Sequence, residues 1–138
     1  MLHRHPLERL LLGASLLPLL LVTGCGPPRT ELVPGPRPAD VALGGRWTSN
    51  WGELKLAQEG EAVRGTFDYN DGQLEGVLQG DLFLFDWLQP PDPTAARMTV
   101  KGKGYFRISP DGQILEGAWG YGAQREGGGA WRAQRINR

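Results

Sequence analysis

The chain contains one cysteine, Cys25, whose thiol is the most nucleophilic group that the sequence offers. Cys25 directly follows an apolar stretch that begins at Leu10, and the basic residues His3, Arg4, His5 and Arg9 precede that stretch. A charged start, an apolar core and a small-residue exit are typical of a secretory signal peptide. The apolar run is shorter than the roughly 20 residues of a membrane span. The thiol is therefore expected at the end of an export signal; a buried free cysteine beside a chance apolar helix is the alternative.

The residues Leu21-Val22-Thr23-Gly24-Cys25 resemble the lipobox of bacterial lipoproteins. The resemblance implies that the thiol of Cys25 is diacylglycerol-modified, and that cleavage between Gly24 and Cys25 leaves the cysteine at the new N-terminus. The lipid on Cys25 would then attach the exported protein to a membrane. Gly26 after the cysteine implies the outer membrane, with the protein on its periplasmic face or at the cell surface.

Both histidines of the chain, His3 and His5, lie inside the expected signal peptide. The processed chain would then hold no histidine and no free thiol, which excludes Ser-His-Asp and Cys-His catalysis, Cys/His zinc sites and an internal disulfide. An enzyme would need a carboxylate pair, and the spacing of the available carboxylates favours none: Asp68, Asp71, Glu75, Asp86 and Glu116. We expect no catalytic residues, metal or cofactor.

The processed chain has a net charge of about −1, without the basic excess that nucleic-acid binding requires. Three regions are expected: a signal peptide over 1–24, a Pro/Gly-rich linker over 25–43 that begins with the lipidated cysteine, and a domain over 44–138. A proline-rich linker stays extended, so this one could hold the domain about 40–50 Å from the lipid.

Strand-like runs separated by Gly, Asp and Asn follow residue 44. We expect strands near 45–49, 53–58, 62–69, 73–79, 82–88, 98–108, 113–119 and 129–136. Two turns, Asn70-Asp71-Gly72 and Pro110-Asp111-Gly112, each offer a glycine that tolerates positive φ. Eight short antiparallel strands without a covering helix predict an all-β, up-and-down meander closed into a small barrel, because closure removes the unpaired edges. A two-sheet sandwich is the alternative.

Three tryptophans share a Gly-x-Trp motif: Trp47, Trp119 and Trp131. With Arg132 and Arg135 in the last strand, they resemble the calycin barrels (lipocalins, fatty-acid-binding proteins and avidins), in which such a tryptophan closes one end and a late arginine packs over it. The resemblance implies closing roles for Trp47, Trp131, Arg132 and Arg135. It does not extend to biotin, because Ser49 and Glu53 depart from the avidin pattern.

The favoured function is a non-enzymatic binding or accessory module in the bacterial envelope. A small apolar ligand would occupy a cavity lined by Trp51, Phe83, Phe85, Trp87 and Trp119. The alternative is a structural lipoprotein with a solid core, which would contact an envelope protein through Trp51 and the 90–93 loop. A carboxylate-dependent hydrolase ranks last.

Overall fold

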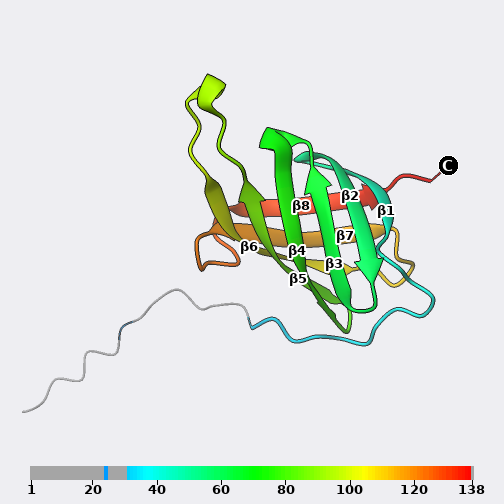
Figure 1. The fold of residues 1–138 in the computed structure, drawn as a ribbon. Coiled ribbons are helices and arrows are strands. Elements are labelled where there is room, and N and C mark those ends of the chain that lie inside the picture. Colours follow the sequence, from blue (N-terminus) through cyan, green and yellow to red (C-terminus); the bar gives the residue numbers. More distant parts are fainter. Residues whose placement is uncertain (1–23, 25–30, 138) are drawn as a thin grey trace, which may run out of the picture. The chain divides into compact units, whose positions relative to one another are not determined.

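The computed structural model describes residue 24 and residues 31–137, and within these residues eight strands form one closed antiparallel barrel (Figure 1). The strands are β1 (Gly45–Ser49), β2 (Gly52–Glu59), β3 (Ala62–Phe67), β4 (Gly72–Gln79), β5 (Leu82–Gln89), β6 (Val100–Ile108), β7 (Ile114–Tyr121) and β8 (Gly129–Arg135). Cys25 and residues 1–23 of the expected signal peptide lie outside the described residues.

Each strand pairs with its neighbours in sequence, and β1 and β8 close the ring. At this seam Trp47 pairs with Arg135, Thr48 with Gln134 and Ser49 with Ala133. The all-β, up-and-down meander barrel expected from the strand pattern is confirmed, and the sandwich alternative is wrong. The expected strand over 62–69 ends at Phe67, because a short 3₁₀ turn, η1 (Tyr69–Asp71), follows it.

The interior of the barrel is filled by inward-facing apolar side chains from alternate positions of the strands. Phe83, Phe85 and Phe106 are almost completely buried and pack on one another, with ring centroids 5.1 to 6.4 Å apart. Trp131 packs against Phe85 and Phe106, at 5.4 Å from each. Burial on this scale is the main stabilising term for a small domain without a disulfide.

Trp47 and Arg135 close one end of the barrel. The Trp47 ring is fully buried, its indole N–H donates to the carbonyl of Leu43, and the Arg135 guanidinium lies over its face. Arg135 also donates hydrogen bonds to the carbonyls of Gly44 and Gly112. Of the two arginines expected to help close the barrel, Arg135 packs on the Trp47 ring. Arg132 does not, because it lies on the outer surface in an ion pair with Glu116.

Residues 33–43, called the strap below, cross the same end of the barrel (Figure 1). Arg107 donates to the carbonyl of Val33, and the N–H of Gly35 donates to Asp81 Oδ1 at 2.7 Å. Leu43 is completely buried in the core, and its N–H donates to Gln58 Oε1. The strap has no strand or helix, in keeping with its prolines, but the compact unit begins at Leu32 rather than at residue 44.

The two expected glycine turns differ in the structure. Gly112 has a φ of 68°, so it takes the left-handed conformation that glycine tolerates. In the other turn Asn70 and Asp71 adopt positive φ, while Gly72 is extended. The expected positive φ at Gly72 is therefore wrong. Glycine is required at this position for another reason, because a Cβ there would lie 2.0 Å from the Phe67 ring.

Candidate functional site

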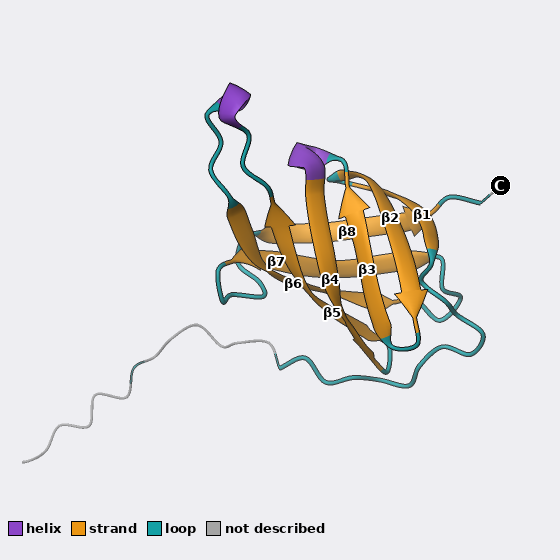
Figure 2. Ribbon diagram, in the orientation of Figure 1, coloured by secondary structure: helices purple, strands orange, loops and turns teal. Residues whose placement is uncertain are grey.

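The end of the barrel opposite the strap is its mouth, where four connections meet. They are the β1–β2 turn at 50–51, η1 between β3 and β4, the 90–99 loop and the 122–128 loop. Figure 2 shows η1 and the second 3₁₀ turn, η2 (Pro93–Ala95), at this same end of the barrel. Chain segments far apart in sequence therefore surround one opening.

A pocket of about 170 Å³ lies in the mouth. Its wall is mainly aromatic and includes the rings of Trp51, Tyr69, Trp87, Trp119, Tyr121 and Trp131. Asn70 and Gln89 add two amide side chains. An apolar concave wall with a few polar groups is the usual composition of a small-molecule site. We call this cavity the mouth pocket.

Trp119 of β7 stands at the centre of the aromatic wall. Its ring centroid lies 5.4 Å from that of Trp51, 5.8 Å from that of Trp87 and 5.0 Å from that of Tyr121, each in an edge-to-face arrangement. Such pairs contribute about 0.5–1.5 kcal/mol beyond the area they bury. The wall is therefore a connected set of rings whose positions depend on one another.

The five indole N–H groups of the chain fall into two sets. Three have acceptors: Trp47 donates to Leu43, Trp131 to Ser49 Oγ at 3.4 Å, and Trp87 to the carbonyls of Lys103 and Gly120. The indole nitrogens of Trp51 and Trp119 are buried and have no hydrogen-bond partner in the described part of the chain. Both of these residues line the mouth pocket.

The residues predicted to line a cavity separate into two groups. Trp51, Trp87 and Trp119 line the mouth pocket, as the ligand hypothesis requires. Phe83 and Phe85 belong instead to the packed core, at 0% and 1% exposure, and do not line this pocket. Their alternation with Trp87 along β5 correctly placed all three on the inner face. Alternation carries no information on depth along the barrel axis, and depth decides which rings meet the pocket.

Trp131, which was expected to help close the barrel with Trp47, lies at the pocket side of the core. It is 2% exposed, lines the mouth pocket and packs edge-to-face on Phe67 at 5.1 Å. Tyr69, Asn70, Gln89 and Tyr121 are pocket residues that the sequence analysis missed. For Tyr121 a signal was present, because it lies two residues after Trp119 on the same face of β7.

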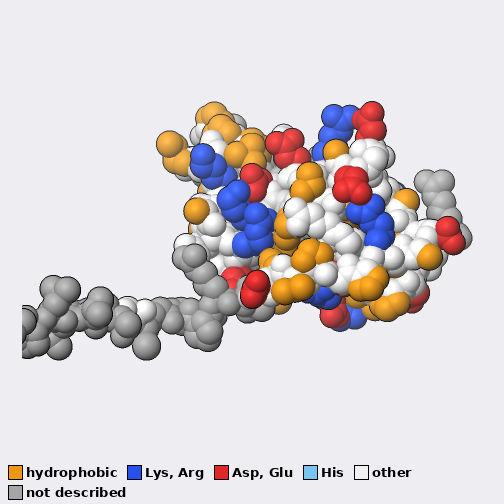
Figure 3. All heavy atoms as spheres, turned by 90° about the horizontal axis from the view of Figure 1, so that it is seen from below, with side chains coloured by type: hydrophobic (Ala, Val, Ile, Leu, Met, Phe, Trp, Pro, Cys, Tyr) orange, Lys and Arg blue, Asp and Glu red, His pale blue; other side chains and the backbone are white. Residues whose placement is uncertain are grey.

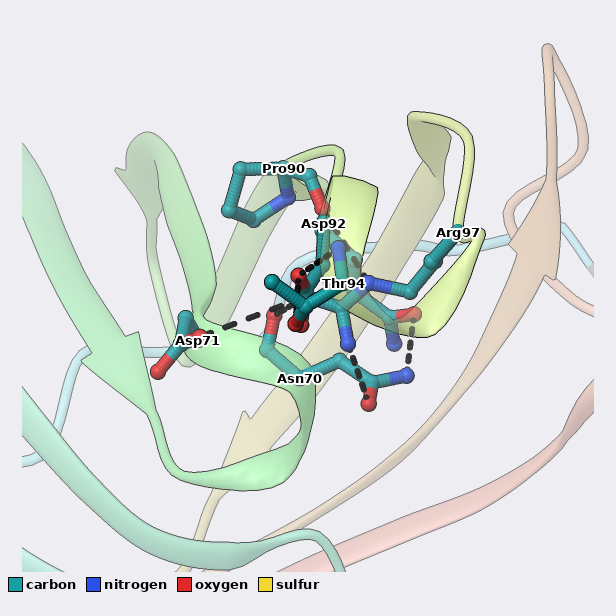
Figure 4. Close-up of polar contacts among 7 residues, drawn as sticks. Asn70, Asp71, Pro90, Asp92, Thr94 and Arg97 are labelled. Atoms are coloured by element: carbon teal, nitrogen blue, oxygen red, sulfur yellow. Dashed lines mark hydrogen bonds and ion pairs between the residues drawn. The ribbon is translucent and has the colours of Figure 1, made fainter.

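A network of polar contacts joins two loops at the rim of the mouth pocket (Figure 4). Arg97, from the 90–99 loop, donates to Asn70 Oδ1 at 2.7 Å and to the carbonyl of Pro90 at 3.2 Å. Asn70 in turn donates its amide to Gln89 Oε1 at 3.1 Å. Asp92 caps η2 through the N–H and hydroxyl of Thr94. Arg97 thus connects the 90–99 loop to η1.

Two of the five carboxylates available for catalysis, Asp86 and Glu116, lie on the outer surface of the barrel in ion pairs. Asp86 forms an ion pair with Lys103 at 2.7 Å, and Glu116 pairs with Arg132. Neither residue lines the mouth pocket. Within residues 31–137 and residue 24, no cluster of three or more His, Cys, Asp or Glu side chains is placed to hold a metal ion.

A wider hollow, of about 990 Å³, runs over the outer face of β2 to β6. It is lined by charged side chains of both signs, namely Lys55, Arg64, Lys101, Lys103, Glu75 and Asp86. On neighbouring strands Arg64 lies opposite Glu75 and Asp86 opposite Lys103, whereas Glu75 and Asp86, which also lie opposite each other, carry the same charge. The face seen in Figure 3 likewise carries Lys, Arg, Asp and Glu side chains intermingled. The hollow is an open surface with more basic than acidic side chains, rather than an enclosed site.

Comparison with known proteins found no matching family model, no matching curated protein and no matching solved structure. Among the residues that the structure describes, no helix has the length and apolar character to cross a membrane. The assignment of a function therefore rests on the barrel, the mouth pocket and the sequence motifs.

Proposed function

We propose that this protein is a lipid-anchored, non-enzymatic binding module of the bacterial envelope, and that the mouth pocket is its ligand site. One observation carries the proposal: a solid aromatic core gives way, at one end of the barrel, to an open pocket walled by aromatic rings. A barrel that only needed stability would fill this space, because an unfilled apolar cavity costs packing energy. The retained space supports binding.

The anchor in this proposal is the lipid on Cys25, for which the lipobox-like motif is the support. Val33, the first strap residue held by Arg107, follows Cys25 by eight residues. An extended chain of that length spans at most about 29 Å, so the strap shortens the tether expected from the linker alone. The strap and the mouth pocket lie at opposite ends of the barrel (Figure 1). Two or three acyl chains would make the attachment stable.

The net charge of about −1 and the ion pairs of Arg37, Lys103 and Arg107 with acidic side chains support a partner other than nucleic acid. The outward position of Asp86 and Glu116 gives a carboxylate-dependent hydrolase no support. A second candidate, contact with an envelope protein, is favoured by two side chains at the mouth: Met98 is 80% exposed and Tyr121 is 59% exposed.

The test is whether a small molecule accompanies the full-length protein purified from its own membranes. Val100 lines the mouth pocket, so Val100→Phe would fill it, whereas Val77 is exposed on the outside of the barrel and Val77→Phe is the matched control. Solvent extraction and mass spectrometry should find one molecule in the wild type and in Val77→Phe, and should not find it in Val100→Phe. Equal recovery from all three proteins, or from none, would count against ligand binding.

A further inference from the structure

We infer that the mouth pocket selects a neutral, single-ring molecule that carries a hydrogen-bond acceptor, and that the indole N–H groups of Trp51 and Trp119 bind this acceptor. The inference rests on the proposed function, because it names the ligand class of the same pocket. Three properties of the pocket lead to it: its size, the charge of its wall and its unpaired donors.

The size of the pocket sets the size of the ligand. An apolar protein cavity of about 150 Å³ accommodates benzene. The mouth pocket, at about 170 Å³, therefore has room for one six-membered ring with a small substituent. A fatty acid or another long-chain lipid does not fit this volume, and the barrel beyond it is filled by Phe83, Phe85 and Phe106.

The wall of the pocket favours a neutral ligand. Of the described residues, those that line it include no Lys, Arg, Asp or Glu. The negative faces of the aromatic rings disfavour an anion, and the Arg97 guanidinium beside the pocket is engaged by Asn70 and Pro90. Ring faces do attract cations, but a cation would meet two buried N–H donors, which repel it. A neutral molecule avoids both conflicts.

The unpaired donors specify the acceptor. A buried N–H without a partner is destabilising, and the chain avoids this state at Trp87, which lines the same pocket and donates to two carbonyls. Trp51 and Trp119 remain unpaired, and their rings are in edge-to-face contact at 5.4 Å. A carbonyl oxygen, with two lone pairs, is the simplest single group that satisfies two donors on adjacent rings.

Two probes of nearly the same shape test the inference: cyclohexanone, which has an acceptor, and methylenecyclohexane, which has none. Each is titrated into the full-length protein, freed of bound small molecules, and the indole N–H cross-peaks are followed by ¹H–¹⁵N NMR. Cyclohexanone should bind about tenfold more tightly than methylenecyclohexane, and it should shift the Trp51 and Trp119 cross-peaks most. Choline and benzoate, one cation and one anion, should bind more weakly than cyclohexanone.

Three variants assign the preference to the two donors. Trp51→Phe and Trp119→Phe keep an aromatic ring and remove the N–H, so each should reduce the tenfold preference severalfold. Trp47→Phe, outside the pocket, is the control: the Trp47 N–H is paired with the carbonyl of Leu43 and phenylalanine keeps a ring beneath Arg135, so the preference should persist.

The outcomes separate the two proposals. If both neutral probes bind the wild type equally, or if choline or benzoate binds best, the ligand class is wrong while the mouth pocket remains a binding site. If no probe moves any cross-peak of the pocket tryptophans, both the ligand class and the proposed function are overturned. The comparison of probes on the wild type decides the question even if a variant fails to fold.

Discussion

The guanidinium carbon of Arg135 lies 4.2 Å from the centroid of the Trp47 ring, and these two residues are also register partners where β8 meets β1. The first and the last strand are thus joined by backbone pairing and by a cation–π contact at the same position. Since β1–β8 pairing is what makes the sheet a barrel, this contact stabilises the closure itself.

Replacing Arg135 should therefore weaken the whole domain. Arg135→Ala removes the cation–π contact and the hydrogen bonds to the carbonyls of Gly44 and Gly112, so we expect the free energy of unfolding to fall by about 2 kcal/mol. Arg132→Ala, three residues earlier on the same strand, removes only an exposed ion pair and should cost less than about 1 kcal/mol. Urea denaturation measures both, and equal losses would contradict a closing role for Arg135.

The strap should detach from the barrel in acid. Burial raises the pKa of Asp81, but hydrogen bonds from Arg107 and from the Gly35 N–H outweigh it and hold the pKa below its ordinary value. The ionised carboxylate therefore stabilises the docked strap above the unfolded-state pKa of about 3.9, and this stabilisation is lost as the pH falls through the lower folded-state pKa.

The amide cross-peak of Gly35 reports this transition, because its N–H donates to Asp81 Oδ1. It should stay constant from neutral pH to about pH 4 and move only below that value. In Asp81→Asn the cross-peak should occupy a shifted position that no longer changes with acid. A midpoint near pH 6, or the same titration in Asp81→Asn, would show that another group controls the strap.

Arg97 should control the order of the mouth without supporting the barrel. Arg97→Ala removes the contacts from the 90–99 loop to Asn70, so amide exchange at 69–71 and 90–99 should accelerate by about tenfold, which corresponds to about 1.4 kcal/mol of local stability. Lys101→Ala, at an exposed position of neighbouring β6, is the control and should leave exchange unchanged. Unfolding of the whole domain in Arg97→Ala would contradict a role confined to the rim.

Attachment to the membrane should depend on Cys25 alone. Cys25→Ser removes the thiol that the lipobox-like motif would present for modification, so the protein should move from the membrane fraction to the soluble fraction. The wild type should also show the added mass of the acyl chains on a peptide that begins at Cys25. Cys25→Ser that stays with the membranes would contradict the lipid anchor and point to another mode of attachment.

The barrel was predictable because its signals are local and repeated. Alternation in segments such as Val63 to Phe67 identifies the inner face of a strand, and eight such segments with short turns leave closure as the simplest way to pair every edge. The contact between Trp47 and Arg135 could be anticipated for a related reason, because closure of a meander brings its first and last strands together.

The strap and the turn at Gly72 were not predictable from local patterns. The contact of Gly35 with Asp81 joins residues 46 positions apart, and the proline content around Gly35 indicates only that regular structure is absent. The two Asp-Gly turns look alike in sequence, but only Gly112 uses positive φ. The Phe67 ring occupies the space next to Gly72, and this tertiary contact decides why glycine is required there.

The mouth pocket was predicted only in part, for a geometric reason. The strand pattern placed Trp51, Trp87 and Trp119 correctly, since each lies at or near a strand end at the mouth. Asn70 and Gln89 enter the pocket wall because η1 and the end of β5 meet there. Such residues are defined by which loops share one end of the barrel, and this information appears only once the strand order is known.

The most direct test of a ligand site in the mouth is the indole region of the ¹H–¹⁵N spectrum, which holds one N–H cross-peak for each of the five tryptophans. The full-length protein is compared as isolated from its own membranes and after extraction and refolding. The cross-peaks of Trp51 and Trp119 should differ between the two samples, while that of Trp47, at the closed end, should coincide. Five coincident cross-peaks would contradict the proposal that the mouth pocket holds a ligand.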